Sequence, residues 1–305
     1  MFSLPDCSQI VALALAEDLG VEPDRFAPHA AGSLDLLTRD VTSASAIGLD
    51  PHFAGRIICR EDAVVAGLPV VAAVYETLSM AAGLFDPIEV FPLVAEGARV
   101  KAGTPVAEVQ GVAAAVLVGE RTALDFLMLL SGMATETARW VKGAGPELAV
   151  CDTRKTMPGM RALSKYAVRV GGGTNHREGL FDMVLVKDNH ITAAGGITAA
   201  VAAARTAHPD LVIEVEADTI AQAIEAVEAG AHMVLLDNMD DAALTNAVAA
   251  VRSAASLAGR EVLTEASGGI TRSRLRALRG TGVDRVSTSS LTIGLRVVDF
   301  GLDER

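Results

Sequence analysis

The sequence predicts an α/β protein of about two domains, and three observations support this fold class. Its 305 residues are enough for two domains of roughly 150 residues each. From residue 148 onward, short β-like runs alternate with helix-like segments, which indicates a parallel sheet. Polar or charged residues gather at or just beyond the end of each run. This favours a barrel over an open sheet, because a (β/α) barrel builds its active site on the rim that those ends form.

The runs and helices alternate in order along the second half of the chain. The β-like runs are Leu148–Cys151, Met183–Val186, Leu211–Val215, His232–Leu236, Glu261–Thr264 and Val283–Ser287. Helices are predicted at Ile197–Ala207, Thr219–Ala229, Ala242–Ala258 and Thr271–Arg279. The polar residues at the run ends are Asp152, Arg154, Lys155, Lys187, Asp188, Glu214, Glu216, Asp237, Asn238, Glu265, Ser267, Ser287 and Ser289. We expect these side chains to share one rim.

The first half of the chain has a different order of elements. A short amphipathic helix ends at Gly20, and residues 21–40 are loop-like. There follow a strand at Ala54–Arg60, a helix at Pro69–Ala82, a hairpin at Gly97–Gly111 and a long helix over residues 113–140. The long helix is apolar nearly all round, which predicts that it is buried. The break at Gly143–Pro146 is a candidate transition between domains.

Composition excludes several classes of protein. The net charge of −12 argues against a general nucleic-acid binder. The longest apolar stretches, Ala63–Tyr75 and Val112–Val118, are shorter than the ~20 residues of a spanning helix. Cys7, Cys59 and Cys151 form no CxxC pair, so we expect small buried side chains rather than a disulfide framework or a zinc site. The N-terminus lacks the basic region of a secretion signal. These features predict a soluble cytoplasmic protein without nucleic-acid or membrane partners.

Residues 151–190 form a cationic segment in this acidic chain. They hold seven Lys and Arg against four Asp and Glu, which favours an anion site. Arg161, Lys165 and Arg169 are spaced four apart on a helix that begins at Pro158, and we expect them to form a solvated basic face. The other basic residues lie at run ends or in a loop, where anion recognition is the better interpretation: Arg154, Lys155, His176, Arg177 and Lys187.

Two glycine-rich loops add to the anion signal. The first, residues 171–177, reads GGGTNHR and brings the backbone, His176 and Arg177 close to any bound carboxylate. The second contains Ser267, Gly268 and Gly269 ahead of a helix, where free N–H groups bind phosphate. The loop Thr288–Ser290 follows the next run, in the position that is common for phosphate sites in barrels.

Glu216 and Asp237 end consecutive runs and could face each other across the rim. Carboxylates beside a phosphate site suit Mg²⁺, which takes few protein oxygens and shares the phosphates of the substrate. Alternatively, the two acids balance the charge of nearby Arg and Lys. Residue chemistry alone leaves both interpretations open.

Several blocks in order resemble the quinolinate phosphoribosyltransferase family. They are Gly119–Thr135, Asp152–His190 (DTRKTMPGMRALSKYAVRVGGGTNHREGLFDMVLVKDNH), Ile213–Asp218, Val234–Met239 and Glu265–Ile270. The resemblance implies an open (β/α) barrel of about seven strands at 128–292. It also implies an N-terminal α/β sandwich domain at 1–127 that is joined by the C-terminal tail, 293–305. It further implies a homodimer with a shared active site, or a higher oligomer.

The activity that the resemblance implies is transfer of phosphoribose from phosphoribosyl pyrophosphate to quinolinate. The products are nicotinate mononucleotide, pyrophosphate and CO₂, with Mg²⁺ as cofactor, in NAD biosynthesis. The implied catalytic residues are Lys155, Glu216 and Asp237, and the two acids also hold Mg²⁺, directly or through water. The implied substrate-binding residues are Arg121 from the partner subunit, Thr153, Arg154, His176, Arg177, Lys187, Ser267, Gly268, Gly269, Thr288, Ser289 and Ser290.

The chain departs from the family pattern at two site positions. Ser289 stands where the family usually has Gly in the last phosphate loop, and Asp125 stands where Asn is common. Three alternatives remain: a molybdenum-transport-associated relative of the same fold, a nicotinate-specific phosphoribosyltransferase and a non-catalytic ligand-binding paralogue. The complete TRKTMPG and GGGTNHR blocks argue against the first. The basic set suits two carboxylates, against the second, and retention of both Glu216 and Asp237 argues against the third.

Overall fold

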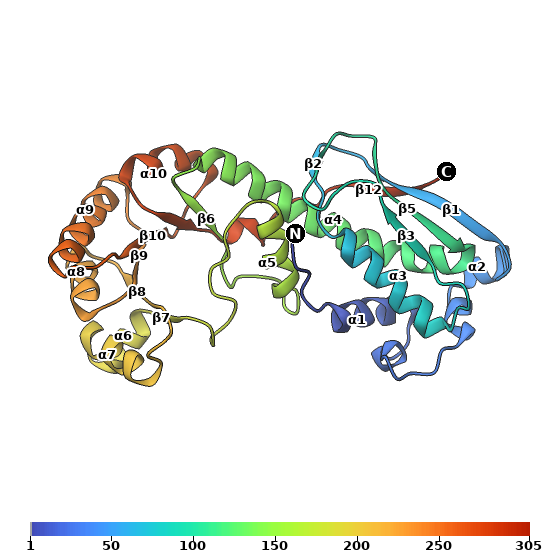
Figure 1. Ribbon diagram of the computed structural model, residues 1–305, viewed down its shortest axis with the longest axis horizontal. Helices are drawn as coiled ribbons and strands as arrows, with labels where there is room; N and C mark the ends of the chain where they lie inside the picture. The colour runs from blue at the N-terminus through green and yellow to red at the C-terminus, as the bar shows by residue number, and fades with distance from the viewer. Residues whose placement is uncertain (1) are drawn as a thin grey trace. The chain divides into compact units, whose positions relative to one another are not determined.

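The computed structural model describes residues 2–305, which divide into two compact units (Figure 1). The first unit comprises residues 1–136, 157–171 and 294–305, and the second comprises residues 137–156 and 172–293. The 32-residue helix α4 (Ala113–Ala144) contributes to both units. The division therefore falls inside a continuous helix, after Glu136, whereas the sequence-based boundary at 127/128 remains a prediction. Among the described residues, no helix combines the length and apolarity that crossing a membrane requires.

The first unit contains an antiparallel sheet in the order β12-β1-β5-β3. Its strands are β1 (His52–Cys59), β3 (Glu89–Pro92), β5 (Thr104–Val112) and β12 (Phe300–Glu304). The helices and 3-10 turns of this unit are α1 (Ser8–Leu19), η1 (Pro23–Phe26), η2 (Leu34–Arg39), α2 (Val41–Ala46), α3 (Leu68–Ala82) and α5 (Arg161–Val170). Helix α1 ends at Gly20, as predicted, and Gly20 adopts the left-handed conformation there.

Two sequence-based predictions for this unit are wrong. The predicted hairpin at 97–111 is absent, because β4 (Arg99–Val100) pairs with β2 (Ala63–Val64) whereas β5 pairs with β1. The predicted solvated face on α5 also fails, since Lys165 is fully buried. Seven of the ten residues of α5 are buried, Lys165 among them, whereas Arg161 and Arg169 are partly exposed. The long helix α4 is largely buried, as its composition predicted.

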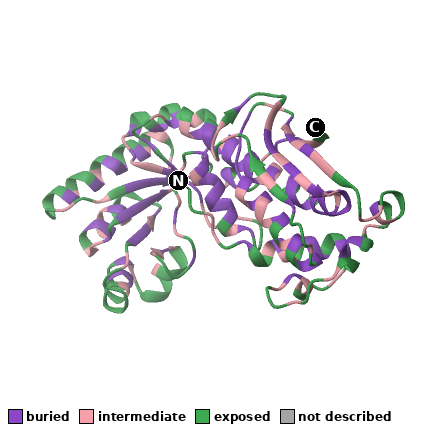
Figure 2. Ribbon diagram, turned by 45° about the vertical axis from the view of Figure 1, so that its right-hand side comes forward, coloured by how far each residue is buried: buried purple, intermediate pink, exposed green. Residues whose placement is uncertain are grey.

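The second unit is built on a six-stranded parallel sheet in the order β6-β11-β10-β9-β8-β7. The strands are β6 (Ala149–Cys151), β7 (Val184–Val186), β8 (Ile213–Ala217), β9 (Met233–Asp237), β10 (Leu263–Ser267) and β11 (Arg285–Ser287). The helices are α6 (Asp188–Ala194), α7 (Ile197–Ala207), α8 (Ile220–Ala229), α9 (Asp241–Leu257) and α10 (Leu275–Thr281), with 3-10 turns η3 (Arg272–Arg274) and η4 (Ser289–Leu291). The strands are mostly buried and the helices expose their outer sides (Figure 2).

This arrangement confirms an α/β fold with a (β/α) barrel architecture and a separate N-terminal sheet. The described residues form six barrel strands, whereas about seven were predicted. Next to the edge strand β6, Thr174 makes a single parallel bridge to Cys151 in place of a seventh strand. The predicted helix at 271–279 divides into η3 and α10.

Candidate active site

The functional side chains of the second unit share one face of the parallel sheet. Glu216 pairs with Leu235, Leu235 pairs with Glu265, and Glu265 pairs with Arg285, so all four point to the same side. Residues two positions away along each strand lie on the same face. This inner face therefore carries Cys151, Glu214, Glu216, Asp237, Glu265, Ser267, Arg285 and Ser287. The opposite face is apolar apart from Thr264, with Val150, Val186, Val215, Val234, Leu236, Ala266 and Val286.

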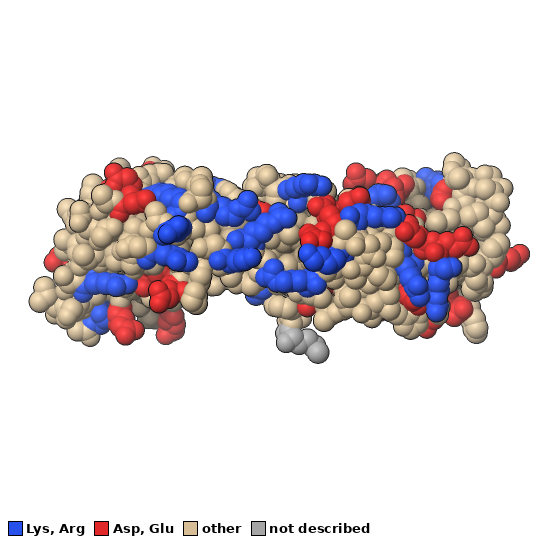
Figure 3. Space-filling view, turned by 90° about the horizontal axis from the view of Figure 1, so that it is seen from above, with Lys and Arg blue, Asp and Glu red and all other residues tan. Residues whose placement is uncertain are grey.

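The rim layer at the carboxyl ends of the strands contains several of the predicted site residues. Lys187 follows β7 and forms an ion pair with Glu216, and their side chains are 42% and 13% exposed. Asp237 ends β9 beside Ser267, its partner in β10. The sequence therefore placed these groups correctly at one edge of the sheet. On the face drawn in Figure 3, Lys and Arg side chains form clusters despite the negative net charge of the chain.

The segment after β6 and the GGGTNHR loop bring further cations together. Lys155 is exposed, its N–H donates to Thr153 Oγ1 over 3.0 Å, and its carbonyl accepts from Thr292 Oγ1 over 2.7 Å. Burial lowers the pKa of the Arg177 guanidinium, and the positive charge of Arg154 lowers it further. Two cations in mutual repulsion provide a place where an anionic ligand is stabilising.

A buried cluster lies one layer deeper on the same face and consists of His176, Glu214, Glu265 and Arg285. His176 Nε2 is 2.9 Å from Glu214 Oε2 and 3.6 Å from Glu265 Oε1. Arg285 Nε is 2.8 Å from Glu265 Oε2, and an Arg285 N–H donates to Cys151 Sγ over 3.0 Å. Glu214 and Glu265 have no solvent exposure. The predicted contact of His176 with substrate stays a prediction, while the structure gives both ring nitrogens partners inside the protein.

The second glycine loop forms a tight turn beside Asn238. Gly268 and Gly269 have φ of +82° and +59°, and a Cβ on Gly268 would collide with the Asn238 side chain. Asn238 N–H donates to Ser267 O over 3.0 Å. These glycines line a pocket of about 390 Å³ with Met239, Asp240, Asp241 and Arg274. The neighbouring loop after β11 is shaped by Thr288, whose hydroxyl accepts from Ser290 N–H, while Ser289 begins η4.

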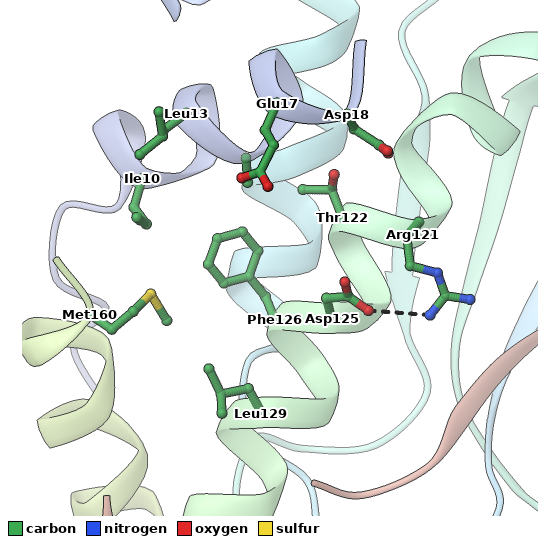
Figure 4. A pocket seen from close by; sticks show the side chains of 11 residues that line it. Ile10, Leu13, Glu17, Asp18, Arg121, Thr122, Asp125, Phe126, Leu129 and Met160 are labelled. Atoms are coloured by element: carbon green, nitrogen blue, oxygen red, sulfur yellow. Dashed lines mark hydrogen bonds and ion pairs between the residues drawn. The ribbon is translucent and has the colours of Figure 1, made fainter. Parts of the chain in front are cut away.

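Arg121 lies on α4 in the first unit, away from the sheet residues in sequence. Its side chain is 59% exposed and pairs with Asp125 over 3.2 Å. It borders a pocket of about 520 Å³ that has an apolar wall and an acidic edge (Figure 4). The wall comprises Ile10, Leu13, Phe126, Leu129 and Met160, and the acids are Glu17, Asp18 and Asp125.

The rim residues fit a Mg²⁺ ion as far as donor chemistry goes. Glu216 and Asp237 supply carboxylate oxygens from neighbouring strands on one face. Mg²⁺ uses one or two protein carboxylates together with substrate phosphates, so two acids suffice. Three members of the buried cluster, His176, Glu214 and Glu265, bring potential metal-ligand atoms within 4.8 Å of one another.

Sequence reasoning noted Glu214 and Glu265 as polar residues near strand ends but assigned them no role, and it passed over Arg285. The signal was the spacing within the strands. Glu214 precedes Glu216 by two, Glu265 precedes Ser267 by two and Arg285 precedes Ser287 by two. A charge two positions before a rim residue lies on the same face and one layer deeper.

The chain matches sequence models of the quinolinate phosphoribosyl transferase family over most of its length. The C-terminal domain model matches residues 133–303, and the N-terminal domain model matches residues 40–131. The chain belongs to the quinolinate phosphoribosyltransferase family. Curated relatives of this family include the nicotinate-nucleotide pyrophosphorylase [carboxylating] of Mycobacterium leprae, which is 39% identical over 87% of this chain and 90% of the relative. A probable enzyme of the same name from Synechocystis is 42% identical over 81% of each chain.

Solved structures of the quinolinate phosphoribosyltransferase family extend the likeness to the whole fold. The nicotinate-nucleotide pyrophosphorylase from Francisella tularensis superposes with a TM-score of 0.84 and 32% identity. That comparison covers 100% of this chain and 98% of the other.

Proposed function

We propose that this protein transfers the phosphoribosyl group of phosphoribosyl pyrophosphate to quinolinate and releases nicotinate mononucleotide, pyrophosphate and CO₂. One observation carries the proposal: Lys187, Glu216 and Asp237 lie at the carboxyl ends of neighbouring parallel strands, and Arg154 and Arg177 follow Cys151 and Thr174, which bridge at the edge of the same sheet. A dicarboxylated pyridine needs the cations, and a sugar that develops positive charge needs the acids. Family membership supports the same reaction.

Binding of the two substrates divides the rim into regions. The cations Arg154, Arg177 and Lys187 grip the carboxylates of quinolinate through charge-assisted hydrogen bonds, with Thr153 and His176 nearby. The loops that contain Ser267–Gly269 and Thr288–Ser290 hold the 5′-phosphate with N–H and hydroxyl donors. Lys155, which is exposed, reaches the pyrophosphate.

The chemical step then needs electrostatics and positioning rather than a protein nucleophile. The bond between C1′ and the pyrophosphate oxygen breaks with its electron pair on the leaving group, and Lys155 neutralises the charge that develops there. Glu216 and Asp237 stabilise the positive charge on the ribose until the pyridine nitrogen bonds to C1′. Glu216 and Asp237 would hold a Mg²⁺ ion, which would supply further neutralisation of the pyrophosphate charge. The bond between the ring and the carboxylate beside the ring nitrogen then breaks, and the carboxylate leaves as CO₂. The electron pair of that bond stays on the ring carbon, where the positively charged nitrogen stabilises it, until the carbon takes a proton from water.

The proposed enzyme is a homodimer in which Arg121 completes the site of the other subunit. Its support is the position of Arg121: the side chain is 59% exposed on a helix that is otherwise largely buried, and it forms an ion pair with Asp125. A charge in this position can contact a second copy of the chain.

A turnover assay with quinolinate against nicotinate tests the proposed reaction. We expect formation of nicotinate mononucleotide and CO₂ from quinolinate, no turnover of nicotinate, and loss of activity when EDTA removes divalent cations. Asp237→Asn should lower kcat at least 100-fold, whereas Asp210→Asn, on an exposed loop, serves as the matched control. Binding of quinolinate without turnover, or preferential use of nicotinate, would contradict the proposal.

A further inference from the structure

The roles described so far leave the buried cluster unused. Glu214, Glu265 and Arg285 sit one layer beneath the rim, and the two glutamates are completely buried. Burial of two carboxylates beside one guanidinium is costly unless ion pairs and hydrogen bonds compensate for the lost hydration. The cluster touches the rim through His176, which immediately precedes Arg177 in the chain.

Two hydrogen bonds and one ion-pair contact hold His176 in place. The backbone N–H of His176 donates to Asp152 Oδ1 over 2.8 Å. Its Nδ1 accepts from the Arg177 N–H over 2.7 Å. Its Nε2 lies 2.9 Å from Glu214 Oε2. Since Nδ1 accepts a hydrogen bond, a neutral ring carries its proton on Nε2, the nitrogen that lies in ion-pair contact with Glu214.

The same geometry argues against a metal ion in the cluster. His176, Glu214 and Glu265 offer three potential ligand atoms within 4.8 Å of one another. A metal ion would require a lone pair on Nε2, but Nδ1 already presents its lone pair to the Arg177 N–H. The ring would then have to lose both protons. In addition, Arg285 already occupies one oxygen of Glu265 over 2.8 Å.

We propose that Glu214 is a positioning residue, which holds His176 in its Nε2–H tautomer and thereby fixes the backbone N–H of Arg177 at the rim. The inference rests on the proposed function, because the fixed Arg177 is one of the cations assigned to quinolinate. Glu214 itself touches no substrate. Its effect is transmitted along Glu214, His176 and the first peptide group of Arg177.

Glu265 and Arg285 hold Glu214 and His176 from the neighbouring strands. Burial and the negative charge of Glu214 together raise the pKa of Glu265 to about 7, and the positive charge of Arg285 acts in the opposite direction. The groups that face this carboxyl are Glu214 from β8, His176 from the GGGTNHR loop, and Arg285 and Ser287 from β11. A proton on Glu265 would leave Glu214 and Arg285 as one balanced pair of charges next to a neutral imidazole.

The tautomer of His176 can be measured directly in the full-length protein. Long-range ¹H–¹⁵N NMR on protein with ¹⁵N-labelled histidine distinguishes the tautomers, and His176→Gln assigns the signal among six histidines. We expect the Nε2–H form in the absence of substrate and an unchanged signal on addition of Mg²⁺ or Zn²⁺. An Nδ1–H form would overturn the proposal, and so would a metal-dependent shift of this signal.

Kinetics separate positioning from simple stability. Glu214→Leu removes the acceptor and should raise the KM for quinolinate about tenfold, with the KM for phosphoribosyl pyrophosphate unchanged. Glu214→Gln keeps an acceptor oxygen and should recover both the quinolinate KM and the Nε2–H signal. Glu228→Gln, at an exposed position on α8, is the matched control.

Two outcomes of these kinetics contradict the inference. One is an equal rise in both KM values in Glu214→Leu, and the other is failure of Glu214→Gln to recover either readout. If the wild-type protein does not turn over quinolinate, the proposed function fails, but the NMR measurement still tests the arrangement of Glu214, His176 and Arg177. If Glu214→Leu does not fold, the tautomer of His176 in the wild type and the quinolinate KM of Glu214→Gln still test the inference.

Discussion

Glu265 illustrates how a single side chain couples the sheet interior to pH. Its carboxyl group is completely buried, and burial together with the charge of Glu214 raises its pKa to about 7. In an unfolded chain the pKa of a glutamate is about 4.3. Between these two values the folded protein binds a proton that the unfolded chain releases, so Glu265 favours folding at low pH and loses that contribution as the pH rises through 7.

We therefore expect the free energy of unfolding to fall between pH 5 and 7 by up to about 1.4 kcal/mol per pH unit from this residue. Urea unfolding of the wild type and Glu265→Gln over pH 5–8 measures the difference. Glu261→Gln, at an exposed position, is the control. Parallel pH curves for wild type and Glu265→Gln would contradict the assignment.

Residue chemistry predicted the rim but not the layer below it. Lys187, Glu216 and Asp237 were found because polar residues at the ends of apolar runs have few structural explanations. Lys165 was misjudged because spacing of four along a helix places residues on one face without revealing what that face packs against. Arg285 was missed because its partners, Glu265 and Cys151, lie 20 and 134 residues away in the chain.

Among the elements, the turn after β10 has the strictest local requirement. Gly268 combines φ of +82° with close approach of the Asn238 side chain. Any side chain there must shift Asn238 and adopt a left-handed conformation, which costs about 1–3 kcal/mol. The turn joins β10 to η3 and carries the phosphate donors of the proposed site.

Gly268→Ala should raise the KM for phosphoribosyl pyrophosphate at least tenfold, because the loop moves away from the phosphate, while the KM for quinolinate changes little. Steady-state kinetics with each substrate varied in turn measures both. Gly259→Ala is the matched control, since Gly259 has φ of +66° and open space around its Cβ position. It should lower stability without changing either KM. Equal effects of the two substitutions would contradict a phosphate role for the loop.

The elements of the second unit were more predictable than those of the first. Each barrel strand is a short apolar run between helical segments, so all six runs overlap strands of the structure. The false hairpin arose because Gly103 makes a turn between β4 and β5, which resembles a hairpin tip in sequence. Long-range pairing decides otherwise: β4 is only two residues long and joins β2.

For the whole molecule, the central prediction is that two chains build each active site. Arg121→Ala and Lys155→Ala should each abolish most activity when expressed alone. Refolding or subunit exchange of an equal mixture should restore up to about a quarter of wild-type activity, because half of the dimers are then mixed and contain one intact site. Activity assays of the mixture against each variant measure the recovery. Absence of recovery, despite subunit exchange shown by mass spectrometry, would contradict a shared site.

The ion pair between Lys187 and Glu216 has a thermodynamic consequence for the proposed enzyme. Each residue is assigned to a different substrate, yet without substrates each neutralises the other. The substrate that binds first must break this ion pair, and the partner residue then becomes available to the second substrate. Affinity for either ligand is thus linked to occupancy by the other, and by the same factor in both directions.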